Sequence, residues 1–193
     1  MGRDKAWLDL GGQPLIERVL EAAQPAVDRL LIVISPDTHE RAHYLELAAR
    51  WKAEILPDRQ PGAGPLGGIE TALTSLAPAE TALVLACDLP FLTSELLLRL
   101  RQESARRPGE IIVPCDLDGR RQPLAAVYPS ACLELVRAQL HESRRRVDLL
   151  YQKFPTRTLT FADLRELEGA AQFFTNLNTP EDYRGIRAAW DEL

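Results

Sequence analysis

The chain has 193 residues, of which 46% are hydrophobic and 26% charged, a balance typical of one globular domain and not of a disordered chain. Its formal net charge of −5 argues against non-specific binding to nucleic acid, which needs a basic surface, although a local positive site could still hold a small anion. No apolar run approaches the roughly 20 residues of a membrane-spanning helix, and residues 1–5 lead into no secretory signal core.

Five short apolar runs predict β-strands along the chain. They are residues 30–34, 54–56, 81–87, 111–113 and 124–128. Because these runs are almost continuously apolar, we expect strands that are buried on both faces, as in a parallel sheet.

Segments with helical periodicity lie between and after these runs, at residues 15–23, 38–51, 69–76, 93–100 and 131–140 and in the tail from residue 180. Thr93 and Thr179 are predicted N-caps, and Pro180 takes a first helical position. Strands that alternate with helices predict a three-layer α/β fold with a mostly parallel sheet, in a single domain over residues 1–193.

The carboxyl ends of the predicted strands carry two aspartates. Asp58 follows the strand at 54–56 and Asp88 the strand at 81–87. In open α/β sheets ligands bind beyond these ends, so we expect both carboxylates to face one crevice. Asp88 is open to two interpretations: a Mg²⁺ ligand that holds a nucleotide phosphate, or a turn aspartate ahead of Leu-Pro.

Residues 61–68 form a loop with four glycines and two prolines that opens a predicted helix. Its backbone amides could bind an anion or the edge of a base, and a tight surface turn is the alternative. The loop matches neither of the common glycine-rich phosphate-binding fingerprints.

Other polar residues have weaker signals. Lys5 could neutralise a phosphate or be a solvated terminal lysine. His39 and His43 have the spacing of a metal pair on a helix, but their charged neighbours favour a solvated face. The arginines at 120–121 and 144–146 are either solvated or bind an anionic second substrate.

Nucleophile and thiol chemistry have little support. Neither Ser130 nor Ser143 has an evident partner set, which disfavours a covalent hydrolase. The three cysteines, Cys87, Cys115 and Cys132, form no CxxC pair, and we expect buried thiols in a reducing cytoplasm.

The order of these motifs is more specific than any one of them. Along the chain come residues 2–6 (Gly-Arg-Asp-Lys-Ala), 12–16 (Gly-Gln-Pro-Leu-Ile), Asp58, 64–68 (Gly-Pro-Leu-Gly-Gly), 87–90 (Cys-Asp-Leu-Pro), 122–124, 145–147 and 176–182. In this order the sequence resembles the molybdenum cofactor guanylyltransferases, members of a group of nucleotidyltransferases with a Rossmann-like fold. The resemblance covers nearly the whole chain.

The resemblance implies an activity and its partners. The family makes a guanine dinucleotide cofactor and pyrophosphate from GTP and a molybdopterin-type pterin phosphate, and it requires Mg²⁺. Contacts with molybdoenzymes or their chaperones would follow, with no nucleic acid or membrane partner. The alternatives are a relative that uses CTP or another acceptor, and a non-catalytic protein that binds the nucleotide or the pterin.

The resemblance also implies roles for single residues. Lys5 would neutralise the GTP phosphates, Asp58 would contact the nucleotide, and Asp88 would hold Mg²⁺. The family's asparagine on the pterin side falls on Asn178. The loop near the guanine falls on Pro65, Leu66 and Gly67.

The sequence departs from the family at its beginning. Relatives carry an apolar strand and a Leu-x-Gly-Gly-x-Ser-x-Arg loop ahead of the Met-Gly that opens this chain. We expect the natural start to lie upstream, with a shortened sequence or a degenerate paralogue as alternatives. Because the absent strand would be central, we expect a gap in the sheet with unpaired strand edges, and the absent loop would hold the triphosphate through its amides.

Overall fold

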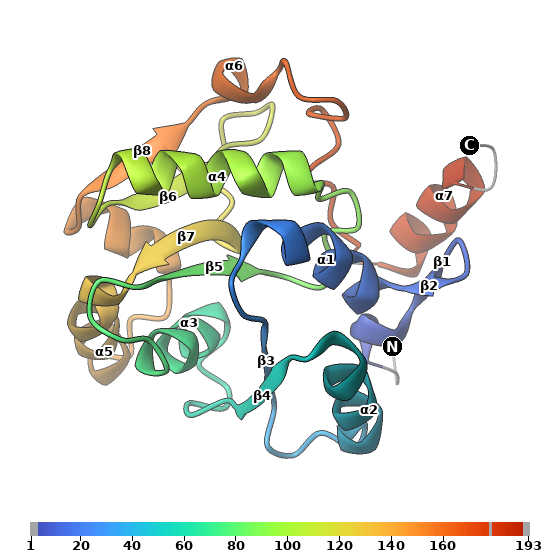
Figure 1. The fold of residues 1–193 in the computed structure, drawn as a ribbon, viewed down its shortest axis with the longest axis horizontal. Helices are drawn as coiled ribbons and strands as arrows, with labels where there is room; N and C mark the ends of the chain where they lie inside the picture. The colour runs from blue at the N-terminus through green and yellow to red at the C-terminus, as the bar shows by residue number, and fades with distance from the viewer. Residues whose placement is uncertain (1–3, 178, 191–193) are drawn as a thin grey trace.

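The structure is a computed structural model that describes residues 4–177 and 179–190 (Figure 1). Its main sheet has four strands in the spatial order β5 (Thr81–Leu85), β7 (Ala125–Pro129), β6 (Ile111–Pro114) and β8 (Thr156–Leu159). Two further pairs are β3 (Leu31–Ile34) with β4 (Glu54–Pro57), and the hairpin β1 (Asp9–Leu10) with β2 (Gln13–Pro14). The five predicted strands are therefore present.

The predicted mostly parallel sheet is confirmed, with one strand, β7, running in the opposite direction. β3 with β4 and β6 with β8 are parallel pairs, but β7 runs antiparallel to both β5 and β6. The short link between β6 and β7 leaves no room for the crossover that a parallel pair requires. A continuously apolar strand fits either direction when helices cover both faces, so composition could not show this.

Helices cover both faces of the main sheet (Figure 1). On one face α1 (Leu15–Ala23) and α4 (Ser94–Arg106) pack on Ile112 and Val127, and on the other α3 (Pro65–Thr74) and α5 (Leu133–His141) pack on Ile111 and Val113. Successive residues of β6 thus enter opposite cores, as strand geometry dictates. The expected three-layer α/β architecture is confirmed.

Shorter and peripheral elements complete the chain. They are α2 (Arg41–Trp51), α6 (Phe161–Leu164), α7 (Pro180–Trp190) and the 3₁₀ segments η1 (Lys5–Trp7), η2 (Gln24–Ala26), η3 (Ser130–Cys132) and η4 (Val147–Gln152). The hydroxyl of Thr93 accepts a bond from the Leu96 amide at 3.3 Å, and that of Thr179 accepts one from Asp182 at 3.1 Å. Both predicted N-caps are confirmed. No helix within the described residues is long and apolar enough to span a membrane.

The β3–β4 pair and the four-stranded sheet are not hydrogen-bonded to each other in the part of the chain that the structure describes. Within the described residues β3 bonds only to β4, and β5 bonds only to β7, so each strand has one unpaired edge. These edges line a cavity of about 1060 Å³, together with α1 and α3. The predicted gap in the sheet is present between β3 and β5.

Candidate nucleotide site

The strand ends beside the cavity bring together segments that are distant in sequence. The Asp58 amide donates to the Ile34 carbonyl at 2.8 Å, so the turn after β4 lies against the end of β3. Cys87, after β5, packs on the hydrophobic cluster that contains Ile34 and Tyr44. Asp58 and Cys87 both line the cavity, and half-buried Asp88 follows Cys87 directly.

The N-terminal segment is attached to the same region through Asp4. Its carboxylate accepts one bond from the Ala6 amide at 3.1 Å, which caps η1, and one from the Tyr44 hydroxyl at 2.6 Å. Burial and the bond to Asp4 raise the pKa of Tyr44 far above its usual value, so this hydroxyl keeps its proton. Lys5, at the start of η1, is half-buried, and the following Ala6 packs in the cluster that contains Ile34 at the end of β3.

Three charged side chains act on the Cys87 thiol. Burial and, to a smaller extent, the carboxylates of Asp88 and Asp4 together raise its pKa to about 12, and Lys5 partly offsets them. The structure therefore brings Lys5 and Asp88 into electrostatic reach of one atom.

The glycine-rich loop adopts conformations that require its glycines. Gly62 has φ +80°, and Gly64, the residue before α3, has φ +67° and ψ −153°. α3 begins at Pro65, four residues before the predicted start, because proline fits the first helical turn. Pro65 is exposed and lines the cavity, so the helix begins at the candidate site.

Two residues of the loop sequence serve packing. Leu66 has no exposed surface and its side chain lies in the core under the sheet, so its backbone is the part of the residue that could contact a ligand. Gly67 is buried against the 58–63 segment: a Cβ there would lie 2.9 Å from the Gln60 carbonyl and 3.3 Å from Asp58 Oδ1. Glycine at 67 is explained by this close approach.

Most residues of the two arginine clusters pair with nearby acids. Arg120 lies 3.4 Å from Asp118, Arg144 3.2 Å from Glu142, and Arg146 2.7 Å from Asp148. Arg145 instead donates to the Gly62 carbonyl at 2.7 Å, which ties the loop after α5 to the glycine-rich loop.

The structure places His39 and His43 at the surface, in agreement with the favoured interpretation of a solvated face. α2 begins only at Arg41, so His39 precedes the helix, and His43 bonds to Glu40 at 2.6 Å. Across residues 4–177 and 179–190, no three His, Cys, Asp or Glu side chains are grouped as metal ligands. Asn178 lies outside the described residues, although the adjacent Leu177 amide donates to the Asp88 carbonyl at 3.1 Å.

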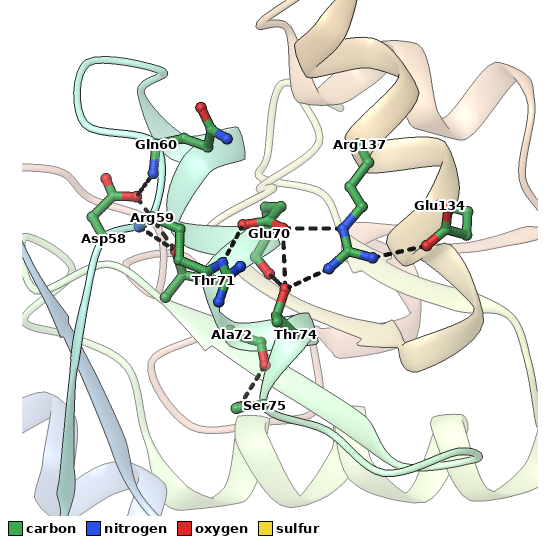
Figure 2. A network of polar contacts seen from close by, with 10 residues as sticks. All are labelled: Asp58, Arg59, Gln60, Glu70, Thr71, Ala72, Thr74, Ser75, Glu134 and Arg137. Atoms are coloured by element: carbon green, nitrogen blue, oxygen red, sulfur yellow. Dashed lines mark hydrogen bonds and ion pairs between the residues drawn. The ribbon is translucent and has the colours of Figure 1, made fainter.

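A polar network on α3 was missed by the sequence analysis (Figure 2). Buried Glu70 accepts from Arg137 of α5 at 3.2 Å and lies 3.7 Å from Arg59, while buried Thr71 contacts the 58–60 turn. The signal was available: Glu70 and Thr71 are polar residues inside an otherwise apolar helix, where a buried polar group needs a partner.

The comparison with known protein families decides the relationship. A sequence model described as the MobA-like NTP transferase domain matches residues 1–156. The chain belongs to the MobA-like NTP transferase family. It is 37% identical over 187 residues to the probable molybdenum cofactor guanylyltransferase of Methanothermobacter thermautotrophicus, covering 95% of this chain and 91% of the relative. It is 31% identical over 188 residues to the molybdenum cofactor guanylyltransferase of Desulfosudis oleivorans, covering 97% and 88%.

Solved structures share the MobA-like fold. Molybdopterin-guanine dinucleotide biosynthesis protein A from Archaeoglobus fulgidus superposes with a TM-score of 0.81 at 24% identity, over 100% of this chain and 93% of that protein. Rv0371c from Mycobacterium tuberculosis, described as a complex with manganese, gives 0.64 at 19% identity, over 97% and 93%. The Rossmann-like fold that the motifs implied is confirmed, and a divalent metal occurs in one protein that has it.

Proposed function

We propose that this protein transfers GMP from GTP to the phosphate of molybdopterin, giving the guanine dinucleotide cofactor and pyrophosphate. The relatives that carry this name align over nearly the whole chain. The observation that carries the proposal is the meeting of Asp58, the Cys87-Asp88 turn and the start of α3 around one cavity. This is the edge of an α/β sheet where ligands bind.

The proposed roles follow from charge and position. Lys5 neutralises phosphate, Asp58 accepts a hydrogen bond from the nucleotide, and Pro65 and Gly67 shape the loop beside the base. Asn178 is proposed to face the pterin. We propose that Asp88 holds Mg²⁺, which favours carboxylate oxygens and often takes only one or two from a protein, with phosphates and water completing its shell.

The donor set fits such a metal. Asp88 is a half-buried carboxylate at a strand end, so a cation there would compensate for the partial loss of hydration of its charge. The absence of a three-residue ligand cluster within the described residues agrees with a metal shared with substrate phosphates. When bound, Mg²⁺ supplies charge neutralisation on the phosphate oxygens.

The reaction joins two anions, so the protein's contribution is positioning and charge. Lys5 offsets part of the repulsion, and Asp58 and the glycine-rich loop orient the nucleotide so that attack is in line. No general base is required, because a phosphate nucleophile is already ionised near neutral pH. This agrees with the lack of a histidine at the candidate site among the described residues.

The test is replacement of the proposed metal ligand. Asp88→Ala should lower GTP-dependent pyrophosphate release, in the presence of molybdopterin and Mg²⁺, by at least ~100-fold. Asp118→Ala removes an exposed carboxylate from a surface turn and is the matched control, with unchanged turnover expected. The assay is run on this chain and on a version extended at its N-terminus with the preceding segment of a relative.

The substrate arms separate the alternatives. CTP in place of GTP should give no product. Turnover with CTP but not with GTP would indicate the alternative of a relative that uses CTP. Near-native turnover of Asp88→Ala would contradict the assignment of the metal. GTP binding without pyrophosphate release in either version would indicate a non-catalytic binding protein.

A further inference from the structure

Thr71 of α3 lies under the turn that carries Asp58 (Figure 2). Its side chain is buried, with 3% of the residue exposed. The hydroxyl accepts from the Arg59 amide at 3.0 Å and donates to Asp58 Oδ1 at 3.4 Å. Because the amide can only donate, the hydroxyl proton is left for the carboxylate, and the direction of both bonds is fixed.

The Asp58 carboxylate is held on one side only. Oδ1 accepts from Thr71 and, at 3.0 Å, from the Gln60 amide. No bond to Oδ2 is found from any of the described residues. One oxygen is therefore used to orient the group, and the other remains able to accept from a ligand.

The helix beneath the turn is itself anchored. Thr71 lies one helical turn beyond Gly67, which makes the close approach to Gln60 and Asp58. Glu70 and Thr74, on the neighbouring face, bond to Arg137 of α5 at 3.2 and 3.3 Å. α3 is thus fixed to α5 through Arg137 and to the Asp58 turn through Thr71.

We propose that Thr71 is the positioning residue for Asp58, orienting its carboxylate toward the nucleotide without touching the nucleotide itself. The inference rests on the proposed role of Asp58 in nucleotide binding. Loss of the hydroxyl would leave the part-buried Arg59 amide without its partner and free the Asp58 side chain to rotate. We expect weaker nucleotide binding and not slower chemistry, because the displaced Asp58 carboxylate is proposed to contact the nucleotide and not the reacting phosphates.

The experiment compares variants at positions 71 and 75 by calorimetric titration with GTP and by steady-state kinetics. Thr71→Val should raise the Kd and KM for GTP about tenfold, the effect of one lost hydrogen bond to a charged group, with kcat within about twofold. Thr71→Ser keeps the hydroxyl and should restore affinity to within about twofold. Ser75→Ala, the control at the end of the same helix, removes a hydroxyl that donates to the Ala72 carbonyl at 2.7 Å, away from both the Asp58 turn and Arg137, and should leave GTP affinity unchanged.

Asp58→Ala separates failure of this inference from failure of the proposed function. If Asp58→Ala binds GTP normally, the role of Asp58 is wrong. If Asp58→Ala weakens binding and Thr71→Val does not, the positioning role is wrong. The double variant should bind no more weakly than Asp58→Ala alone, and additive losses would also overturn the inference. Should Thr71→Val fail to fold, Thr71→Ala, which also lacks the hydroxyl, replaces it.

Discussion

The four-stranded sheet and the β3–β4 pair differ in how completely their strands are paired and covered. In the four-stranded part, β6 and β7 are paired on both edges, and helices fill both faces. In the β3–β4 part, one small cluster with α1 and α2 buries Ile32 and Ile34, and the free edge of β3 faces the cavity. The comparison teaches that the rigid scaffold and the accessible space are separate regions, and the candidate site lies where they meet.

The boundary explains why the site residues come from both parts. Asp58 belongs to the two-stranded part and Asp88 to the four-stranded part, and α3 reaches from one to the other. Leu66 and Ile69 anchor α3 in the large core, while its first turn and Gly67 support the Asp58 turn. The geometry of the site therefore depends on how firmly α3 is held.

The largest expected effect tests the difference in packing directly. Ile112→Ala removes a residue with no exposed surface from the middle of the four-stranded part and should lower the free energy of unfolding by about 4 kcal/mol. Ile32→Ala, the matched change in the other part, should cost about 2 kcal/mol, because Ile32 already borders a cavity. Urea unfolding measures both, and equal losses would contradict the comparison.

The sequence could predict most of the scaffold because its signals are local. The apolar runs predicted strands, and Thr93 and Thr179 were predicted as N-caps; the structure contains both. The antiparallel β7 could not be predicted, because an apolar strand buried on both faces has no directional pattern. β8 (Thr-Arg-Thr-Leu) contains no apolar run, and α6 is a single helical turn, too short for periodicity to show.

The site could be predicted only in outline. Asp58 and Asp88 follow apolar runs, which placed them at strand ends, but the bond between Thr71 and the Asp58 turn joins positions 13 residues apart and depends on the path of the loop between them. The burial of Leu66 likewise depends on where α3 starts. Lys5 had no local signal, and its position comes from the bond between Asp4 and Tyr44, which spans 40 residues.

A smaller effect is expected from two adjacent glycines at the boundary. Gly67→Ala places a Cβ 2.9 Å from the Gln60 carbonyl, so the turn must shift, and we expect a loss of about 2 kcal/mol in unfolding free energy together with weaker GTP binding. Gly68→Ala meets nothing within 4 Å and should stabilise the helix by about 0.5 to 1 kcal/mol. Urea unfolding and calorimetry with GTP measure the pair.

The outcome for the glycines sharpens the role of α3. If both alanines are tolerated, the Asp58 turn is not held by close packing on the helix. If both are harmful to GTP binding while only Gly67→Ala is destabilising, Gly68 lies against the nucleotide, and the contact surface of the site is wider than the residues assigned above.

The smallest effect concerns two thiols that have similarly raised pKa values but differ in their access to solvent. Burial raises the pKa of both Cys87 and Cys132 to about 12, but Cys87 lines the cavity whereas Cys132 has no exposed surface. Iodoacetamide should label folded Cys87 slowly at pH 8, about tenfold faster with each pH unit, and should label Cys132 only in urea. Because folding favours the protonated thiols, stability is unaffected below about pH 9, the unfolded pKa, and falls as the pH rises toward 12. A labelling rate for Cys87 that levels off near pH 9 would show an ordinary, solvated thiol and a cavity open to water. Equal labelling of Cys132 in the folded protein would show that the four-stranded part is no better packed than the β3–β4 part.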